Sequence, residues 1–98
     1  MDRRLAVAFR NLRKAGYLAK RNFWCCGSCG VSAIERNYPK YQNRYVFASK
    51  QSESDLRNRG VLRVDWAGLG VEIVRLIEEA GLVVEWSGNS EQRICIFL

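Results

Sequence analysis

Three of the four cysteines lie close together in the segment Cys25-Cys26-Gly-Ser-Cys29-Gly, and the fourth, Cys95, lies far along the chain. Cys26 and Cys29 have the C-x-x-C spacing of half a zinc knuckle, in which glycines let the backbone turn so that its N–H groups point at the sulfurs. A tetrahedral zinc site needs four ligands, usually from two such pairs. The chain has no second C-x-x-C and no histidine. We therefore expect no cofactor unless Cys25, Cys26, Cys29 and Cys95 together bind zinc.

A second interpretation of the C-x-x-C pair is a reversible redox dithiol made of Cys26 and Cys29. A thiol at the N-terminus of a helix has a lowered pKa and reacts faster. Such a motif should follow a strand and precede a long helix, and the sequence before Cys25 matches a strand only weakly. A third interpretation is that these cysteines are small packed residues in a tight corner. Cys95 lies between two isoleucines, which predicts a buried structural thiol on a strand.

Two segments, residues 17–24 and 36–45, interleave basic and aromatic side chains. Cations contact phosphates and flat rings stack on bases, and both are needed to hold a nucleotide or a single strand. Our first hypothesis is a non-enzymatic binding module whose N-terminal half holds a phosphate-bearing ligand, either a nucleotide or a nucleic acid. The cations expected to contact phosphate are Arg10, Arg13, Lys14, Lys20, Arg21, Lys40 and Arg44. The rings expected to stack are Trp24, Tyr38 and Tyr41.

The charge is distributed unevenly along the chain. Residues 1–50 carry eleven Lys or Arg against two acids, a balance of +9, whereas residues 51–98 carry five Arg against eight acids, a balance of −3. Such asymmetry predicts an anionic partner, although a basic face that only aids solubility would give the same pattern. Tyr, Trp and Arg also dominate protein interfaces. The alternative is therefore a small protein-binding inhibitor or adaptor, for instance of mobile-element origin, acting on a nucleic-acid-processing complex.

The residues argue against catalysis and against a membrane location. Histidine is absent, so the usual general base is missing. No GxSxG, P-loop or GxGxxG motif is present. Charges interrupt the N-terminal segment every few residues, unlike a signal peptide, and no run approaches the roughly 18 apolar residues of a membrane helix. We expect a non-enzymatic cytoplasmic protein without a membrane partner, in a compartment that keeps thiols reduced.

The chain length suits one domain, residues 1–98. Hydrophobic spacing predicts helices over residues 2–15, with Asp2 as N-cap, and over 68–80. A shorter helix opened by Ser28 or Ser32 is expected to run through about residue 37. Another is expected over 52–59, opened by Ser52 and closed by Gly60. The expected strands are 44–49, 61–66, 82–86 and 93–97, while residues 17–25 are either extended or a loop. This order predicts an α+β fold: a four-stranded mixed sheet, two to four helices mainly on one face, and a C-terminal β-hairpin.

The segments "RKAGYLAKRNFWCCGSCG", "RYVFASKQSE" and "IEEAGLVVEWSGNSEQRICIFL" together resemble an uncharacterised family of small bacterial domains of unknown function. That family is similar in its Cys-Cys-x-x-Cys-Gly motif, its Tyr-Val-Phe strand and its Ala-Gly-Leu-x-Val-x-Trp ending. After the Tyr-Val-Phe strand the family tends to carry a His-Gln-Gln-Asp run, where this chain has residues 49–52, Ser-Lys-Gln-Ser. The resemblance implies a compact α+β fold and a genuine cysteine motif, and it implies no activity.

Overall fold

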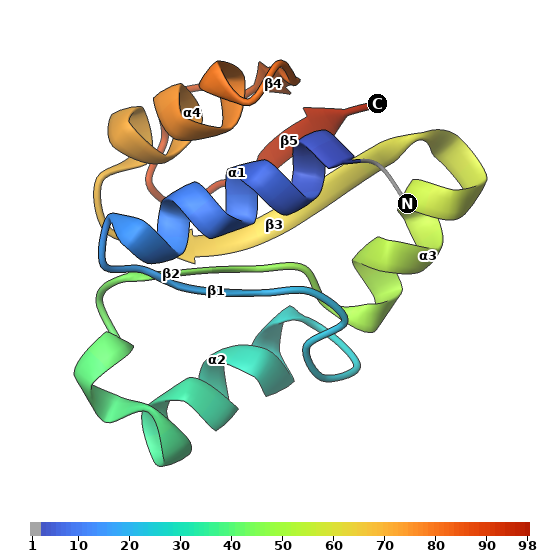
Figure 1. Ribbon diagram of the computed structural model, residues 1–98. Coiled ribbons are helices and arrows are strands. Elements are labelled where there is room, and N and C mark those ends of the chain that lie inside the picture. The colour runs from blue at the N-terminus through green and yellow to red at the C-terminus, as the bar shows by residue number, and fades with distance from the viewer. Residues whose placement is uncertain (1–2) are drawn as a thin grey trace.

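The computed structural model describes residues 3–98, so the predicted N-cap Asp2 lies outside the described part of the chain. The elements follow in this order along the chain (Figure 1): α1 (Arg3–Lys14), β1 (Leu18–Lys20), α2 (Gly27–Asn37), a short 3-10 helix η1 (Pro39–Tyr41), β2 (Tyr45–Phe47), α3 (Lys50–Arg59), β3 (Val61–Ala67), α4 (Gly70–Glu79), β4 (Val83–Glu85) and β5 (Ile94–Phe97). The α+β class is confirmed, with four α-helices.

The sheet has five strands in the order β1-β2-β3-β5-β4. β1 runs parallel to β2, and the remaining neighbours are antiparallel, so the sheet is mixed. β4 and β5 form the predicted C-terminal hairpin. The expectation of four strands is wrong because β1 comes from the segment 17–25 that the sequence left undecided. Three residues are too few to show the alternation by which a strand is recognised.

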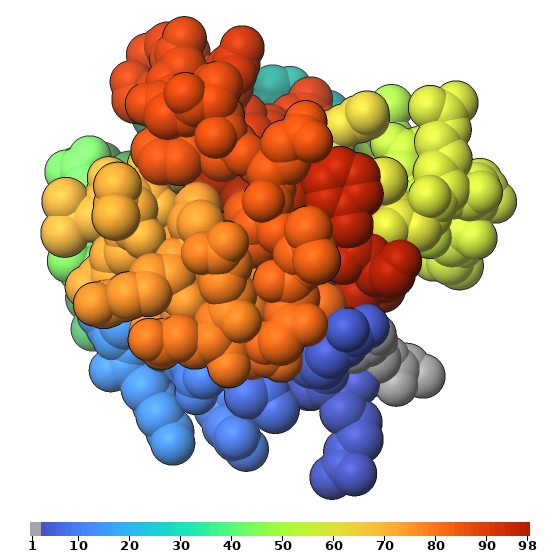
Figure 2. Space-filling view, turned by 90° about the horizontal axis from the view of Figure 1, so that it is seen from above, coloured from blue at the N-terminus to red at the C-terminus, as the bar shows by residue number. Residues whose placement is uncertain are grey.

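Helices cover both faces of the sheet. α1 and α4 lie side by side on the first face (Figures 1 and 2), where Phe9 and Ile77 pack against Val46 and Ile96. α2 lies on the second face, where Ile34 packs against Tyr45 and Phe47. The prediction that the helices pack mainly on one face is therefore corrected for α2.

β2 is buried on both sides because its residues alternate between the two cores. Val46 belongs to the core beneath α1 and α4, whereas Tyr45 and Phe47 belong to the core beneath α2. All three side chains are buried. A strand covered on both faces reads as a continuous apolar run, as this one does.

The N-cap of helix α3 lies three residues before the predicted cap, Ser52. Its N-cap is Ser49, whose Oγ accepts a hydrogen bond from the Ser52 backbone N–H at 3.2 Å. Ser52 is instead a buried residue of the first turn. The predicted C-terminal cap is confirmed, because Gly60 adopts a left-handed conformation with φ +72°. Among the helices of residues 3–98, none is long and apolar enough to cross a membrane.

Candidate functional site: three thiols at the N-terminus of α2

The loop between β1 and α2 is fixed by backbone hydrogen bonds to the start of α3. The N–H of Lys50 donates to the carbonyl of Trp24 at 2.9 Å, and the N–H of Gln51 donates to that of Cys25 at 3.3 Å. The first amides of a helix have no partner within the helix, so the loop satisfies them. Trp24 has φ +59°, which is strained for a bulky residue. Tertiary contacts thus hold the cysteine segment in a defined conformation.

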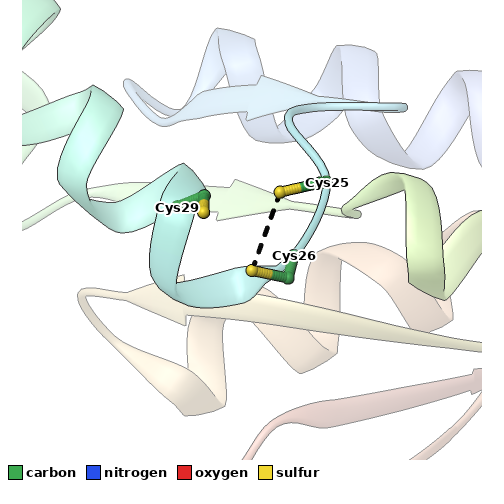
Figure 3. A group of neighbouring side chains, drawn as sticks. All are labelled: Cys25, Cys26 and Cys29. Carbon is green, nitrogen blue, oxygen red and sulfur yellow. Dashed lines mark hydrogen bonds between the residues drawn. The ribbon is translucent and has the colours of Figure 1, made fainter.

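Three sulfurs meet where this loop enters α2. The Sγ atoms of Cys25, Cys26 and Cys29 all lie within 4.8 Å of one another. Cys25 and Cys26 belong to the loop, and Cys29 lies in the first turn of the helix (Figure 3). The Cys25 thiol donates to the Cys26 sulfur at 3.9 Å. Cys26 is the N-cap of α2 and has extended backbone angles.

The surroundings of Cys26 favour its thiolate. Its sulfur lies 3.5 Å from the Ser28 Oγ. The Ser28 hydroxyl, and after it the nearby backbone N–H and thiol of Cys29 and the thiol of Cys25, stabilise the thiolate and lower the pKa of Cys26 to about 6. Negative charge at a helix N-terminus is also favoured by the helix dipole. At neutral pH Cys26 is therefore mainly a thiolate, the reactive form of cysteine.

Cys29 behaves in the opposite way. It shares hydrogen bonds with Cys25 and Cys26, and these contacts together with the neighbouring negative charges raise the pKa of the Cys29 thiol to about 11. Cys29 therefore keeps its proton while Cys26 is ionised. The two thiols, three residues apart, therefore differ in proton affinity: the pKa of Cys26 is lowered and that of Cys29 is raised.

The glycines of the motif serve close packing rather than a turn. Both Gly27 and Gly30 lie inside α2, so the expected glycine turn around the sulfurs does not form. A Cβ atom on Gly30 would lie 2.5 Å from the ring of Phe47, and one on Gly27 would lie 2.8 Å from the carboxylate oxygens of Asp65. The small residues allow the N-terminal turn of α2 to touch the sheet.

The four-cysteine set proposed for zinc does not come together. Cys95 is not part of the sulfur group, which contains Cys25, Cys26 and Cys29. It lies on β5 in register with Arg63 and Glu85. Within residues 3–98, the group contains no fourth ligand from cysteine or from a carboxylate. Three sulfurs without a fourth protein ligand do not make the closed tetrahedral site of structural zinc.

A shallow depression of about 260 Å³ lies beside the sulfurs. It is lined by Trp24, Ser28, Cys29, Ser32 and Arg36. The last four come from α2 at spacings that place them along one side of the helix, and Trp24 closes the depression from the loop. The lining thus combines a thiol, two hydroxyls, a cation and a half-exposed aromatic ring.

Three of the cations predicted to contact phosphate are engaged within the protein. Arg21 forms two hydrogen bonds to the buried carboxylate of Glu53, at 2.7 and 2.6 Å. The Arg44 Nη2 donates to the carbonyl of Ala15 at 2.7 Å, and its guanidinium stacks on the Tyr17 ring at 4.4 Å. The Arg13 Nε donates to the Ala19 carbonyl at 3.0 Å. These side chains join elements together.

The remaining candidates are divided between the two faces of the sheet. Arg10 and Lys14 lie exposed on α1. Lys20 lies over the ring of Tyr38 at 5.5 Å, and Lys40 lies over the ring of Tyr41 at 5.2 Å, on the side of α2 and η1. The predicted phosphate-and-base site is therefore not one convergent site. Of its rings, Trp24 alone lines the depression beside the thiols.

A family model described as "Domain of unknown function (DUF6891)" matches residues 2–98. The chain belongs to this family. The resemblance to a family of unknown function, noted from the sequence, is thereby confirmed, and the cysteine motif on which it rests forms a real cluster. Comparison with curated proteins found no match, and neither did comparison with solved structures.

Sequence reasoning missed Ser28, Ser32, Arg36 and Asp65 as neighbours of the thiols. The helix expected to run through about residue 37 could have indicated the first three, because residues 28, 32 and 36 recur at helical spacing next to Cys29. Asp65 comes from a strand nearly 40 residues away, and only the tertiary fold brings it against Gly27. Its Oδ2 atom is buried, and no group of residues 3–98 forms a hydrogen bond with it.

Proposed function

We propose that this domain is a thiol–disulfide exchange module in which Cys26 is the attacking thiol and Cys29 the resolving thiol. The observation that carries the proposal is the position of Cys26 as the N-cap of α2, with the Cys29 sulfur within 4.8 Å. The sequence argued against a redox motif because the segment before Cys25 matches the pattern of a strand only weakly. The strand β1 precedes it and an 11-residue helix follows it, which is the context that such a motif needs.

The exchange proceeds in two balanced steps. The Cys26 thiolate attacks one sulfur of a substrate disulfide, forms a mixed disulfide, and releases the other substrate sulfur as a thiolate. Cys29 then loses its proton to solvent and attacks the Cys26 sulfur, which forms the Cys26–Cys29 disulfide and releases the second substrate thiolate. Two electrons pass from the protein dithiol to the substrate. An external thiol reverses both steps and regenerates the dithiol.

Cys25 supports the attacking thiol in this scheme. Its S–H donates to the Cys26 sulfur, which stabilises the thiolate before attack. A disulfide bond between the adjacent Cys25 and Cys26 would close a small ring, and the short backbone connection between them would strain that ring. Replacing Cys25 by serine keeps a donor and should therefore preserve exchange.

Trapping of the mixed disulfide tests the proposal. With Cys29→Ser, oxidised glutathione should leave an adduct on Cys26 that persists, whereas the unaltered protein should resolve it to an internal disulfide; intact and peptide mass spectrometry distinguish the two. Cys26→Ser should abolish both products, and Cys25→Ser should behave like the unaltered protein. Adducts on Cys25 instead of Cys26 would refute the proposal. The proposal would also be refuted if the purified protein retained stoichiometric zinc and did not react with oxidised glutathione.

The hypothesis of an anionic partner retains one supporting observation. The outer side of α1 carries no acidic residue, and a hollow of about 490 Å³ on it is lined by Arg3, Arg10 and Arg13 together with two small apolar side chains. Binding of a fluorescent single-stranded oligonucleotide should then be strong at low salt and fall steeply as salt rises. Arg10→Glu should weaken it. Binding that is absent at low salt would exclude this second function.

A further inference from the structure

Part of the second face of the sheet is left open by α2. The side chains that β4 and β5 direct to this face are Val83, Glu85, Cys95 and Phe97, and none of them belongs to either core. Val83 is 69% exposed. The core on this face is instead built around β1 and β2. The C-terminal part of β3 is covered by α2, at Asp65 and Ala67. The open area therefore extends over the start of β3, at Val61 and Arg63, and over β5 and the edge strand β4.

The strand register arranges this open area in two rows. Val61, Phe97 and Val83 are cross-strand partners and make an apolar row over β3, β5 and β4. Arg63, Cys95 and Glu85 make the next row in the same order. Directly paired residues point to the same face of a sheet. The second row therefore carries a cation at one end, a small thiol in the middle and an anion at the other end.

We propose that this open face binds a second copy of the same chain through a twofold axis that runs along β5. Such an axis keeps each position along β5 and exchanges β3 with β4. Arg63 then meets Glu85 of the second copy and Glu85 meets Arg63, while the apolar rows meet each other. A twofold axis across the strands would instead bring Arg63 onto Arg63. The charge pattern thus selects one of the two face-to-face arrangements.

The shape of the molecule fits the same arrangement. α2 covers the β1–β2 half of the second face. The uncovered strands beside it therefore lie lower than the outer surface of α2, by about the thickness of one helix layer, and we call this difference in height the step. Packed sheets are separated by about 10 Å, which is close to the distance between packed layers containing a helix. The second copy can therefore fill the step, with its edge strand β4 beside α2. This contact also covers the unpaired edge of β4, a feature that proteins usually protect.

Two other charged residues, Asp55 and Arg93, lie at the border of the open face. Arg63 lies 3.9 Å from Asp55, and this pair is exposed enough for the guanidinium to reach a second carboxylate. The axis would place Arg93 opposite Arg93 of the second copy. The Nε of each Arg93 lies 3.6 Å from Asp65 of its own chain, so a carboxylate offsets part of the repulsion between the two guanidinium groups. The open face spans only three short strands. We therefore expect it to bury less than the roughly 800 Å² per partner of a standard interface, which predicts a weak, concentration-dependent dimer.

Charge reversal tests the pairing. Sedimentation velocity in reducing buffer, from micromolar to millimolar protein, should show a monomer–dimer equilibrium. R63E and E85R should each weaken it by about tenfold or more, because each single change makes two contacts repulsive. The double variant R63E/E85R should restore association, and far-UV circular dichroism of every variant checks folding. A protein that stays monomeric to millimolar concentration overturns the proposal, as does association that neither single reversal weakens.

The central thiol gives a second, independent measurement. In the variant C25S/C26S/C29S, Cys95 is the only thiol, and the axis places it opposite its own copy. A short bis-maleimide should then link two chains, and R63E in this background should greatly reduce the linked product. The proposed exchange reaction is absent in this background, so the result bears on the interface alone. Equal linking with and without R63E would show random collision and would overturn the arrangement.

Discussion

The guanidinium of Arg21 donates two hydrogen bonds to the buried carboxylate of Glu53, at 2.7 and 2.6 Å. The side chain of Glu53 is only 4% exposed, and that of Arg21 is 21% exposed. The pair joins the residue after β1 to the first turns of α3. It therefore holds the loop that carries the thiols against the start of α3.

The first prediction concerns this pair. Arg21→Met leaves the Glu53 carboxylate buried without its partner and should lower the free energy of unfolding by about 3–5 kcal/mol. Urea denaturation followed by circular dichroism measures the change, with an unchanged slope indicating that the two folded states are comparable.

The matched control is the double variant Arg21→Met with Glu53→Gln. It removes the charge that would otherwise be stranded, so most of the lost stability should return. If Arg21→Met alone changes stability by less than about 0.5 kcal/mol, the pair is an ordinary surface contact and our account of the loop fails.

The second prediction concerns the pH dependence of Cys26. Because hydrogen bonds lower the pKa of this thiol to about 6, first among them the one from Ser28, its alkylation rate should rise with pH and reach half its maximum near pH 6. Rates measured by peptide mass mapping after brief iodoacetamide treatment give the curve for Cys26 alone.

Ser28→Ala should move this midpoint to higher pH, since it removes the largest stabilising contact of the thiolate. Ser32→Ala is the matched control, because Ser32 lines the same depression without a hydrogen bond to Cys26 in the structure of residues 3–98. A midpoint near the ordinary cysteine value of about 8.5 in the unaltered protein would contradict the prediction.

The third prediction concerns the contact between Gly30 and Phe47. A methyl group on Gly30 would lie 2.5 Å from the Phe47 ring, so Gly30→Ala should push α2 away from the sheet. We expect a loss of about 1–3 kcal/mol in the free energy of unfolding, despite the better helix propensity of alanine.

Phe47→Leu in the same chain should relieve the clash. The double variant should therefore be more stable than the sum of the two single changes predicts, which a double-mutant cycle measures. Strict additivity would show that Gly30 and Phe47 are not in the close contact described above.

The fourth prediction concerns Asp65. Burial raises the pKa of this carboxyl, and the Arg93 guanidinium opposes the shift only in part. Since the folded pKa lies above the unfolded one, ionisation of Asp65 weakens the folded state as pH rises through that range. Asp65→Asn should stabilise the protein by about 1 kcal/mol at neutral pH and by nothing at pH 3, where both side chains are neutral.

Thermal unfolding at pH 7 and at pH 3 tests this difference. Glu79→Gln, on the exposed side of α4, should change stability little at either pH. A loss of stability in Asp65→Asn at pH 7 would mean that the ion pair with Arg93 outweighs the cost of burial.

The helices α1 and α4 and the C-terminal hairpin were predictable because each shows a long periodic pattern or a clear turn. α4, for example, repeats apolar residues at Ile73 and Ile77, and both are fully buried. Such patterns depend only on which side of an element faces a core. The three residues of β1 have no pattern of their own and form a strand because β2 lies beside them.

The thiol group and a redox interpretation of Cys26 and Cys29 were both expected from the sequence, but the separation of their two pKa values was not. That depends on Cys26 being the N-cap of α2, which the glycines on both sides of Cys29 concealed. The partners of the basic residues within the protein were not predictable for a related reason. Charge predicts solvent exposure, yet Arg21 and Arg44 are held by a carboxylate and by a carbonyl that come from distant parts of the chain. Such pairings become visible only when the sheet order is known.

The position of β5 constrains how a ribosome-bound chain can fold. β5 lies between β3 and β4 and contacts both, although it is made after them. Until residues 94–97 have left the exit tunnel, β3 and β4 have no partner on these sides, and the core beneath α4 lacks Ile94 and Ile96. The pairing of β1 with β2 and of β2 with β3 does not need β5, whereas the pairing of β3 and β4 with β5 must wait until residues 94–97 are available.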